Sequence, residues 1–515
     1  MTLAILVALV CPLALAKGAA ALPVASAGVN LPEDLATLKG ELRSDNEKTR
    51  RNAVKELAKI SSPAQVEEAW ELIAGVLGDE EPMVADEAQI QFGRSASPAA
   101  LEVLSGKEGL GARDDLVVLR AAEALGRMPQ TVDGELLKKS LGGKQSELRR
   151  TAAWSLERLA RAGNLTGDLG RKVMPALEKA CERDKDEEVR AAALLALEAI
   201  DAGGPPAPNF SEYLATALGD KRPALRVAAL EVLARRPGDA VPSRIKPLAA
   251  APEMAVRKAA LDSLAAQESR AGLMVMVERL EAESELRLRW RAVDHLRRLT
   301  GMKHRLDPRP WRRLVESLDQ NWRPASSASS APAPAEDATS SFVGLPVISE
   351  RLCFLVDFSG SIWEDRGDRT RKDVAGEELR KALESLPETT HFNVIPYTGK
   401  PHPWQDELVP ATKRNVRAAL DYFDGCNERG TGNFWDAARL ALEDESVDTI
   451  MALTDGAPTG GHRWNLELMA DLLPELNRYR RVAFDALLVD TSNFLRRHWE
   501  QMCAATGGRT VQVDL

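Results

Sequence analysis

The 515-residue sequence has few aromatic residues and few cysteines. Phe, Trp and Tyr make up 5% of it, and the abundance of Ala and Leu favours helices packed through small side chains over aromatic-rich sheets. Five cysteines in a chain of this length exclude a fold that depends on disulfide bridges. None of them stands in a CxxC pair, so nothing supports a zinc site, although a Cys426–Cys503 bridge stays open.

The sequence also lacks an excess of positive charge. It carries 68 basic and 77 acidic residues, a net charge of −9, which argues against a nucleic-acid partner held by a basic surface. The hydrophobic content of 44% and the charged content of 28% are ordinary for globular proteins. A chain of this length is too long for one core, so we expect two or more domains.

Only the amino terminus is continuously apolar, and its run is too short to span a bilayer comfortably. The segment MTLAILVALVCPLALA has no charged side chain before Lys17 and ends in an A-x-A pattern. It predicts a signal peptide over 1–16, a spacer over 17–31, and an exported protein that is periplasmic, secreted or on the cell surface. Because no Lys or Arg precedes the apolar run, a buried helix or an uncleaved anchor stays open. No transmembrane segment is expected after removal of the signal.

A helical repeat runs through residues 32–322. Its pattern is a basic or small residue at position i, Ala at i+3 and a large apolar residue at i+7, which share one face of a helix. The intervals between successive copies range from 31 residues (118 to 149) to 41 residues (149 to 190). Such a period predicts a stacked solenoid. The copies begin at Arg50, Ala85, Val118, Arg149, Arg190, Arg226, Arg257 and Arg289.

The arginine at position i has two interpretations. It can pair with an acidic residue between helices, such as Asp79 or Asp184, and so form a structural ladder, or it can line the concave face and bind an acidic partner. The best copy, EEVRAAALLALEAI at 187–200, resembles HEAT-type repeats of the shorter bacterial variety. This resemblance implies a scaffold or a protein-binding surface, so we expect that a second protein partner can bind the solenoid.

The segment 323–341 is rich in Pro, Ala and Ser and predicts a linker that lets two rigid bodies sample different orientations. After it, over 342–515, apolar strands alternate with helices, which predicts a mostly parallel sheet covered on both faces. The expected fold class is therefore multidomain: an all-α solenoid followed by an α/β, doubly wound, Rossmann-like domain. The expected strands are 351–358, 390–397, 448–455, 483–490 and 510–515; the expected helices are 371–386, 413–423, 434–443, 464–478 and 494–505.

Hard oxygen donors follow the ends of these strands. Asp357, Ser359 and Ser361 stand in DFSGS, Thr431 precedes a helix, and Asp455 ends another strand. The carboxyl ends of parallel strands are where ligands bind in such sheets. Two carboxylates and three hydroxyls suit Mg²⁺ or Mn²⁺ with an open coordination shell, and do not suit zinc or copper.

These five residues resemble the metal-ion-dependent adhesion site of the von Willebrand factor A (vWA) domain, whose pattern is D-x-S-x-S, then a Thr, then an Asp. The resemblance covers about 343–515, and Ile362-Trp363 after the second Ser departs from the pattern. It implies that the hydroxyls touch the metal, that the carboxylates act directly or through water, and that a partner protein donates a further carboxylate.

Three tryptophans follow the candidate metal loops. Trp363 and Trp464 are predicted to line the rim of the metal site and to contact the partner, because aromatic anchors strengthen a polar contact. The alternative is that each packs on the helix that it begins, which is the favoured interpretation for all three and most strongly for Trp435.

No catalytic set is evident, since the six histidines show no HExxH spacing and the chain has no GxSxG or phosphate-loop motif. The sequence therefore predicts an exported, non-enzymatic binding or scaffold protein. The alternative is an intracellular scaffold that works beside a ring ATPase or a metal chelatase.

Overall fold

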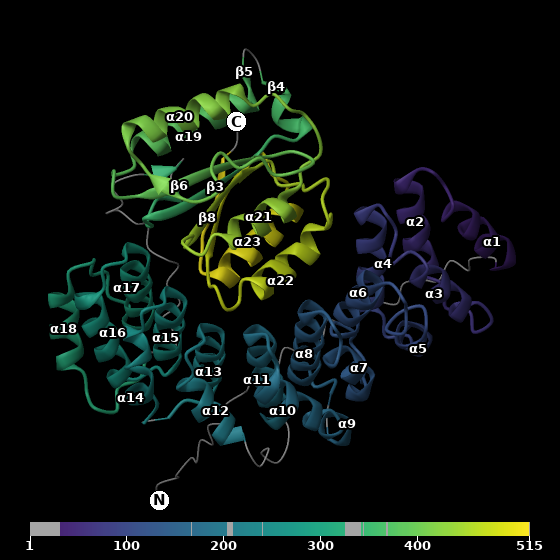
Figure 1. Cartoon of the computed structure of the whole chain (residues 1–515), viewed down its shortest axis with the longest axis horizontal. Helices are drawn as coiled ribbons and strands as arrows, with labels where there is room; N and C mark the ends of the chain where they lie inside the picture. Colours follow the sequence, from purple (N-terminus) through teal and green to yellow (C-terminus); the bar gives the residue numbers. More distant parts are fainter. Residues whose placement is uncertain are drawn as a thin grey trace, which may run out of the picture.

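The computed structural model describes residues 31–165, 167–202, 210–238, 240–324, 341–342, 345–366 and 369–513. The predicted signal peptide, nearly all of the spacer and most of the linker lie outside the described residues. Figure 1 shows a curved helical domain with an α/β domain on its inner side. The predicted fold class is confirmed. Within the described ranges, no helix is both long and apolar enough to cross a bilayer.

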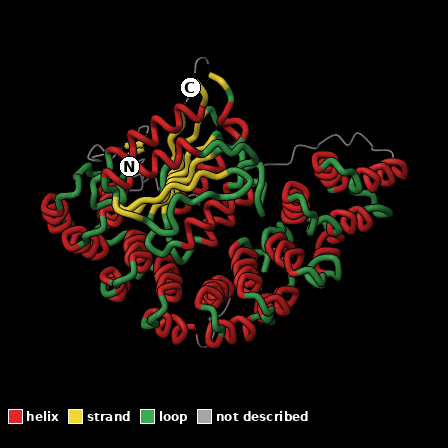
Figure 2. Tube along the Cα trace, turned by 45° about the horizontal axis from the view of Figure 1, so that its top comes forward, coloured by secondary structure: helices red, strands yellow, loops and turns green. Residues whose placement is uncertain are grey.

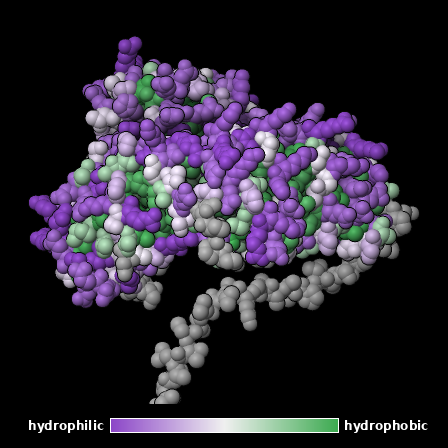
Figure 3. Space-filling model, turned by 60° about the horizontal axis from the view of Figure 1, so that its bottom comes forward, coloured by the Kyte–Doolittle hydropathy of each residue, from purple (hydrophilic) through white to green (hydrophobic). Residues whose placement is uncertain are grey.

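The helical domain consists of two layers of helices along a curved path (Figures 1 and 2). In the inner layer each helix packs on the next: α2 (Glu47–Leu57), α4 (Pro82–Arg94), α6 (Asp115–Leu125), α8 (Ser146–Arg161), α11 (Glu187–Ala202), α13 (Pro223–Arg235), α15 (Met254–Ala266) and α17 (Leu286–Thr300). The outer side has α1 (Leu31–Glu41), α3 (Val66–Ala74), α5 (Pro98–Ser105), α7 (Lys138–Leu141), α9 (Asp168–Arg171), α10 (Met174–Arg183), α12 (Phe210–Leu218), α14 (Val241–Ile245), α16 (Arg270–Ala282) and α18 (Pro308–Ser317). The face of the molecule seen in Figure 3 is mostly hydrophilic, with apolar residues visible in patches.

The repeat pattern of the sequence corresponds to the inner layer. Every Ala at i+3 and every large apolar residue at i+7 is buried in the seam between helices. Four of the arginines at position i, Arg50, Arg149, Arg226 and Arg257, pair with an acidic residue between helices and form the structural ladder that was one of the two interpretations. The other two, Arg190 and Arg289, donate to backbone carbonyls. Arg50 donates to Asp79 at 2.8 and 2.9 Å, and Arg149 donates to Asp184 at 2.7 and 2.8 Å. They therefore join one repeat to the next and do not line the concave face.

The α/β domain is built on a six-stranded sheet of order β10-β9-β8-β3-β6-β7, in which only the edge strand β7 is antiparallel. The strands are β3 (Arg351–Asp357), β6 (His391–Tyr397), β7 (Val409–Pro410), β8 (Thr449–Thr454), β9 (Ala483–Val489) and β10 (Thr510–Val513). Short two-residue strands form separate pairs, β1 (Ser341–Phe342) with β2 (Leu345–Pro346) and β4 (Asp365–Arg366) with β5 (Arg369–Thr370).

Helices cover both faces of the sheet (Figure 2). Alternate residues of β3 face opposite ways, so Leu355 packs with one group of helices and Phe354 with the other. The first group is α21 (Phe434–Glu443), α22 (Leu466–Leu476) and α23 (Asn493–Thr506); the second is α19 (Arg371–Glu384) and α20 (Lys413–Gly425). The chain order reverses at β3, which has β6 on one side and β8 on the other.

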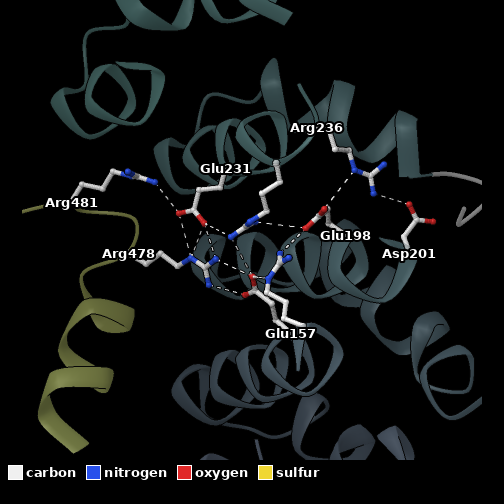
Figure 4. Close-up of polar contacts among 9 residues, drawn as sticks. Glu157, Glu198, Asp201, Glu231, Arg236, Arg478 and Arg481 are labelled. Carbon is white, nitrogen blue, oxygen red and sulfur yellow. Dashed lines mark hydrogen bonds and ion pairs between the residues drawn. The ribbon is translucent and has the colours of Figure 1, made fainter. Parts of the chain in front are cut away.

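The α/β domain is docked on the concave face of the solenoid, which corrects the expectation that the two domains sample different orientations. The segment after α22 supplies Arg478 and Arg481 to the inner helices (Figure 4). Arg478 bridges Glu157 of α8 and Glu231 of α13, each at 2.7 Å. Arg481 bridges Glu231 at 2.9 Å and Asp262 of α15 at 2.7 Å. The sequence pattern could not show this, because charged residues on a helix usually face water.

Further contacts extend the interface at both ends. Toward the end of the solenoid, the buried ammonium of Lys258 donates to the carbonyls of Arg481 and Thr506 at 2.7 and 2.9 Å. Near its start, Ile90 of α4 is buried in the hydrophobic core of the α/β domain. The two domains are therefore joined along much of the inner layer by ion pairs, hydrogen bonds and a shared apolar contact.

The buried carboxylates of this interface are held ionised. Burial by itself disfavours the charge of Glu157, but the guanidinium of Arg478 outweighs it and lowers the pKa of Glu157 to about 2. Burial and arginines act in the same opposed way on Glu231 and Asp262, whose pKa values are also lowered. The docked arrangement therefore depends on ionised carboxylates.

We expect Arg478→Glu to release the α/β domain from the solenoid. The change removes the cation that Glu157 and Glu231 share and puts a third carboxylate beside them. Small-angle X-ray scattering of the full chain should show a larger radius of gyration, and breaking the buried pairs should lower the free energy of unfolding by about 3–5 kcal/mol. Arg414→Glu, at an exposed site on α20, is the matched control. An unchanged radius would contradict the role given to Arg478.

Acid should weaken the same interface. Because the pKa of Glu157 is lowered on folding, its contribution to stability is complete above its ordinary pKa of 4.5 and is lost as the pH falls toward about 2. Urea unfolding of the full chain across this range should show stability falling with pH. Glu157→Gln should flatten the curve in that window, and a variant with the slope of the wild type would refute the assignment.

Candidate metal site

The three predicted metal loops lie at the carboxyl edge of the sheet. The first follows β3, the second precedes α21 and the third follows β8. Because β3 and β8 are neighbouring parallel strands, their carboxyl ends bring Asp357 and Asp455 to the same place. This place is also where the strand order reverses, the usual position of a ligand site in an open α/β sheet.

The first loop turns its two hydroxyls toward each other. Oδ1 of Asp357 accepts the amide N–H of Ser359 at 2.8 Å, which starts a tight turn, and a short 3₁₀ helix follows over Gly360–Trp363. As a result, the hydroxyl oxygens of Ser359 and Ser361 lie 3.1 Å apart. Asp357 is 2% exposed and Ser359 is 4% exposed, so both are largely withdrawn from bulk water.

The second and third loops interlock with the first through glycines. The amide of Gly360 donates to the carbonyl of Gly430 at 3.1 Å. A Cβ on Gly432 would lie 3.5 Å from Oδ1 of Asp357, and a Cβ on Gly460 would lie only 2.3 Å from the Thr431 hydroxyl. The Thr459 hydroxyl accepts the amide of Gly432 at 2.7 Å. The two neighbours of Thr431, Gly430 and Gly432, are thus bonded to the first and third loops, and Thr431 itself is exposed between them.

Burial and a neighbouring carboxylate make the charge of Asp357 costly. Burial, and then the neighbouring charge of Asp455, raise the pKa of Asp357 to about 6, against hydrogen bonds that it accepts from Ser359 and Thr454. A divalent cation would relieve this repulsion. The donor set of carboxylate and hydroxyl oxygens fits Mg²⁺ or Mn²⁺, which accept such ligands together with water.

The structure adds two charged residues that sequence reasoning missed. The guanidinium of Arg371 donates to the carbonyl of Ser361 at 3.2 Å and lies 3.7 Å from Asp455 and 3.5 Å from Asp490. Arg371 therefore supplies part of the countercharge at this edge. Asp490 could have been found, because it follows β9 as Asp357 ends β3; nothing in the sequence distinguishes Arg371 from the other arginines nearby.

The three tryptophans have different surroundings. Trp363 packs edge-to-face on Phe358. Its ring also makes two cation–π contacts, with Lys372 at 4.7 Å and with Arg429 at 4.6 Å from the ring centre. Trp435, the second residue of α21, is buried in the core of the α/β domain. Trp464 is partly exposed, and the Arg51 guanidinium of the solenoid lies 4.4 Å from its ring. Trp363 thus borders the first loop, whereas Trp464 lies at the boundary between the two domains.

The third loop is anchored to the solenoid at its far end. Asp86 of α4 is fully buried and accepts the amides of Trp464 and Asn465 at 2.7 and 2.9 Å. The adjacent Arg463 donates to Glu123 of α6 at 2.8 Å. One loop therefore has Asp455 at its start and a buried solenoid carboxylate at its end. The only signal of this in the sequence is weak, namely an Asp inside a degenerate copy of the repeat.

Comparisons with known proteins follow the division into two domains. A family model described as "HEAT repeat" matches residues 173–202. Mouse inter alpha-trypsin inhibitor heavy chain 4 is 33% identical over 129 residues, which are 23% of this chain and 13% of that protein. Human heavy chain H4 is 32% identical over 130 residues, 23% of this chain and 13% of that one. The chain therefore spans only about an eighth of the length of these curated relatives, which contain a vWA domain.

Two solved structures are also similar to parts of the chain. A von Willebrand factor type A protein from Catenulispora acidiphila has 18% identity and a TM-score of 0.27, and the match covers 33% of this chain and 40% of that one. An aerotolerance-related membrane protein from Bacteroides fragilis has 13% identity and a TM-score of 0.25, with 32% and 90% covered.

Gly460→Ala should disturb the site locally. Its new Cβ would overlap the Thr431 hydroxyl, whereas a Cβ on Gly360 would meet nothing within 4 Å. We expect Gly460→Ala to weaken Mg²⁺ binding about 10- to 100-fold, the range typical of a disturbed shell around a metal. Gly360→Ala, in the loop that carries Ser359 and Ser361, should bind Mg²⁺ as the wild type does. Isothermal titration calorimetry of both variants checks this, and equal affinities would count against the role of Thr431.

Proposed function

We propose that this protein is an exported, non-enzymatic binding protein. Its α/β domain holds Mg²⁺ or Mn²⁺ through Asp357, Ser359, Ser361, Thr431 and Asp455, and a partner protein donates a carboxylate to the metal. The observation that supports the proposal is that Ser359 and Ser361 lie 3.1 Å apart at the carboxyl edge of the sheet, in the loop after Asp357, whose carboxylate feels the charge of Asp455. The partial likeness to inter-alpha-trypsin inhibitor heavy chains and the HEAT match support a protein-interaction role.

The charge of the donor set suits this role. Three of the five ligands are neutral hydroxyls, so the protein itself supplies only two negative charges to a divalent cation. Arg371 further reduces the negative charge available at Asp455, since it lies 3.7 Å from that carboxylate. A divalent metal held by these residues would therefore keep an affinity for an outside carboxylate.

The solenoid has a structural part in the proposed function. Its concave face, which the sequence left open for a second partner, holds the α/β domain through Arg478 and Arg481. Asp86 fixes the end of the third metal loop. The solenoid thus presents the metal site in one orientation, and the surfaces that are left for a partner are its edges and its outer side.

Export of the protein rests on the apolar amino terminus over 1–16. Cell fractionation and amino-terminal sequencing of the mature protein test it. We expect a chain that starts at Lys17 outside the cytoplasm. A cytoplasmic chain that keeps residues 1–16 would favour the intracellular scaffold instead.

The metal-dependent partner is tested by affinity capture with the full chain. Proteins retained in the presence of Mg²⁺ should be released by EDTA and should not be retained by Ser359→Ala, which loses one hydroxyl ligand. Ser385→Ala is the matched control, because its hydroxyl caps the end of α19 by donating to Ala382. The proposal fails if calorimetry detects no binding of Mg²⁺ or Mn²⁺ by the wild type, or if Ser359→Ala retains the same Mg²⁺-dependent proteins.

A further inference from the structure

A groove of about 590 Å³ separates the first repeats of the solenoid from the third metal loop. Helices α2 and α4 form one wall, with Arg51 and Lys55 among its side chains. The other wall is formed by Ala457–Thr459, Trp464 and the start of α23 at Phe494. The groove therefore has one wall from each domain and exists only because the domains are docked.

The groove is continuous with the candidate metal site. Ala457–Thr459 come two residues after Asp455 in the same loop. The Thr459 hydroxyl accepts the amide of Gly432, the residue next to Thr431, at 2.7 Å. A Cβ on Gly432 would also lie within 3.5 Å of Asp357, which places this wall beside the metal ligands. A ligand bound at the metal can extend from there into the groove without crossing another domain.

The wall of the α/β domain combines apolar side chains that are partly open to water with one carboxylate, Glu467, which pairs with Arg94 of the solenoid at 2.5 Å. Phe494 is 58% exposed and is one of three exposed large hydrophobic side chains in the part of the chain that the structure describes. Trp464 is partly exposed in the same groove, with Arg51 over its ring. Exposed aromatic side chains beside a polar site are typical anchors of a protein–protein contact.

The solenoid wall has more positive charge than its own carboxylates balance. Arg51 and Lys55 both approach the same oxygen of Glu87, at 2.9 and 3.5 Å, and Gln91 donates to the other oxygen at 2.8 Å. Glu87 is buried, whereas the Lys55 side chain is 38% exposed. Two cations thus share one carboxylate, and Lys55 presents the uncompensated charge to the groove.

We propose that the groove and the metal site form one binding surface for an extended acidic segment of a single partner protein. This inference rests on the proposed function. One carboxylate of the segment reaches the metal, an apolar side chain packs on Phe494 and Trp464, and a second acidic side chain pairs with Lys55. One partner therefore contacts both domains, and the solenoid contributes to recognition as well as to support.

Peptide selection on the full chain tests the proposal. The probe is a library of short random linear peptides displayed on phage, selected in Mg²⁺ and eluted with EDTA. We expect acidic peptides that also contain an apolar residue. Their affinity, measured by fluorescence anisotropy of synthetic copies, should fall about tenfold for Lys55→Glu and for Phe494→Ala, the size of effect expected when a charge pair is reversed or an anchor is removed.

The controls separate the groove from the metal site. Lys185→Glu, at an exposed lysine in another repeat, should leave the affinity unchanged. Lys55→Met removes the charge without reversing it and should give a smaller loss than Lys55→Glu. Mg²⁺ calorimetry and circular dichroism on each variant confirm that the metal site and the fold are intact.

Three results would overturn the inference. They are the recovery of no Mg²⁺-dependent peptide, the recovery of neutral or basic peptides, and acidic peptides whose affinity is the same for Lys55→Glu as for the wild type. If the wild type binds Mg²⁺ but the groove variants bind peptide normally, the groove alone fails. If the wild type binds no divalent metal, both the proposed function and the inference about the groove fail.

Discussion

The structure depends on the buried pairing of Arg478 and Arg481 with carboxylates of the solenoid. Burying charges is costly, and a buried ion pair on average adds little net stability compared with well-packed apolar residues. These ion pairs instead specify the geometry of docking, because each guanidinium binds carboxylates on two different helices. A docking position that is shifted by one helix would leave buried charges without partners. The pairs therefore select one orientation of the α/β domain among many sterically similar ones.

That orientation decides what surrounds the metal site. The third loop is held at its start by the sheet and at its end by Asp86 of α4, so it cannot move independently of the solenoid. The His462 ring also contacts Asp436 of α21 at 2.8 Å, which ties the loop to the helix that follows Thr431. The geometry of the candidate ligands is thus maintained by contacts from both domains.

Much of each domain followed from local sequence patterns, because those patterns record which side chains must be buried. The Ala and Leu of the repeat predicted the inner layer, and the five expected strands of the sheet match β3, β6, β8, β9 and β10 within one or two residues. The edge strand β7 was missed because a two-residue strand containing Pro410 has no alternation to detect. The five candidate ligands could be proposed from the sequence because each follows a strand or precedes a helix at one edge.

The relation between the domains could not be predicted in this way. Arg478 follows a helix as an ordinary basic residue near its carboxyl end, and Glu157, Glu231 and Asp262 resemble solvated charges on separate repeats. Their pairing joins positions that are more than two hundred residues apart, and a single sequence carries no signal for it.

The position of Trp464 could not be predicted for the same reason, because it depends on how the two domains are docked. Trp363 and Trp464 were grouped because each follows a metal loop, but only the docked domains show that Trp464 lies against Arg51 of the solenoid. An aromatic side chain that seemed to belong to one domain is therefore part of a surface made by two. Because the concave face of the solenoid is covered by its own α/β domain, the proposed recognition uses the edge where both domains border the metal loops.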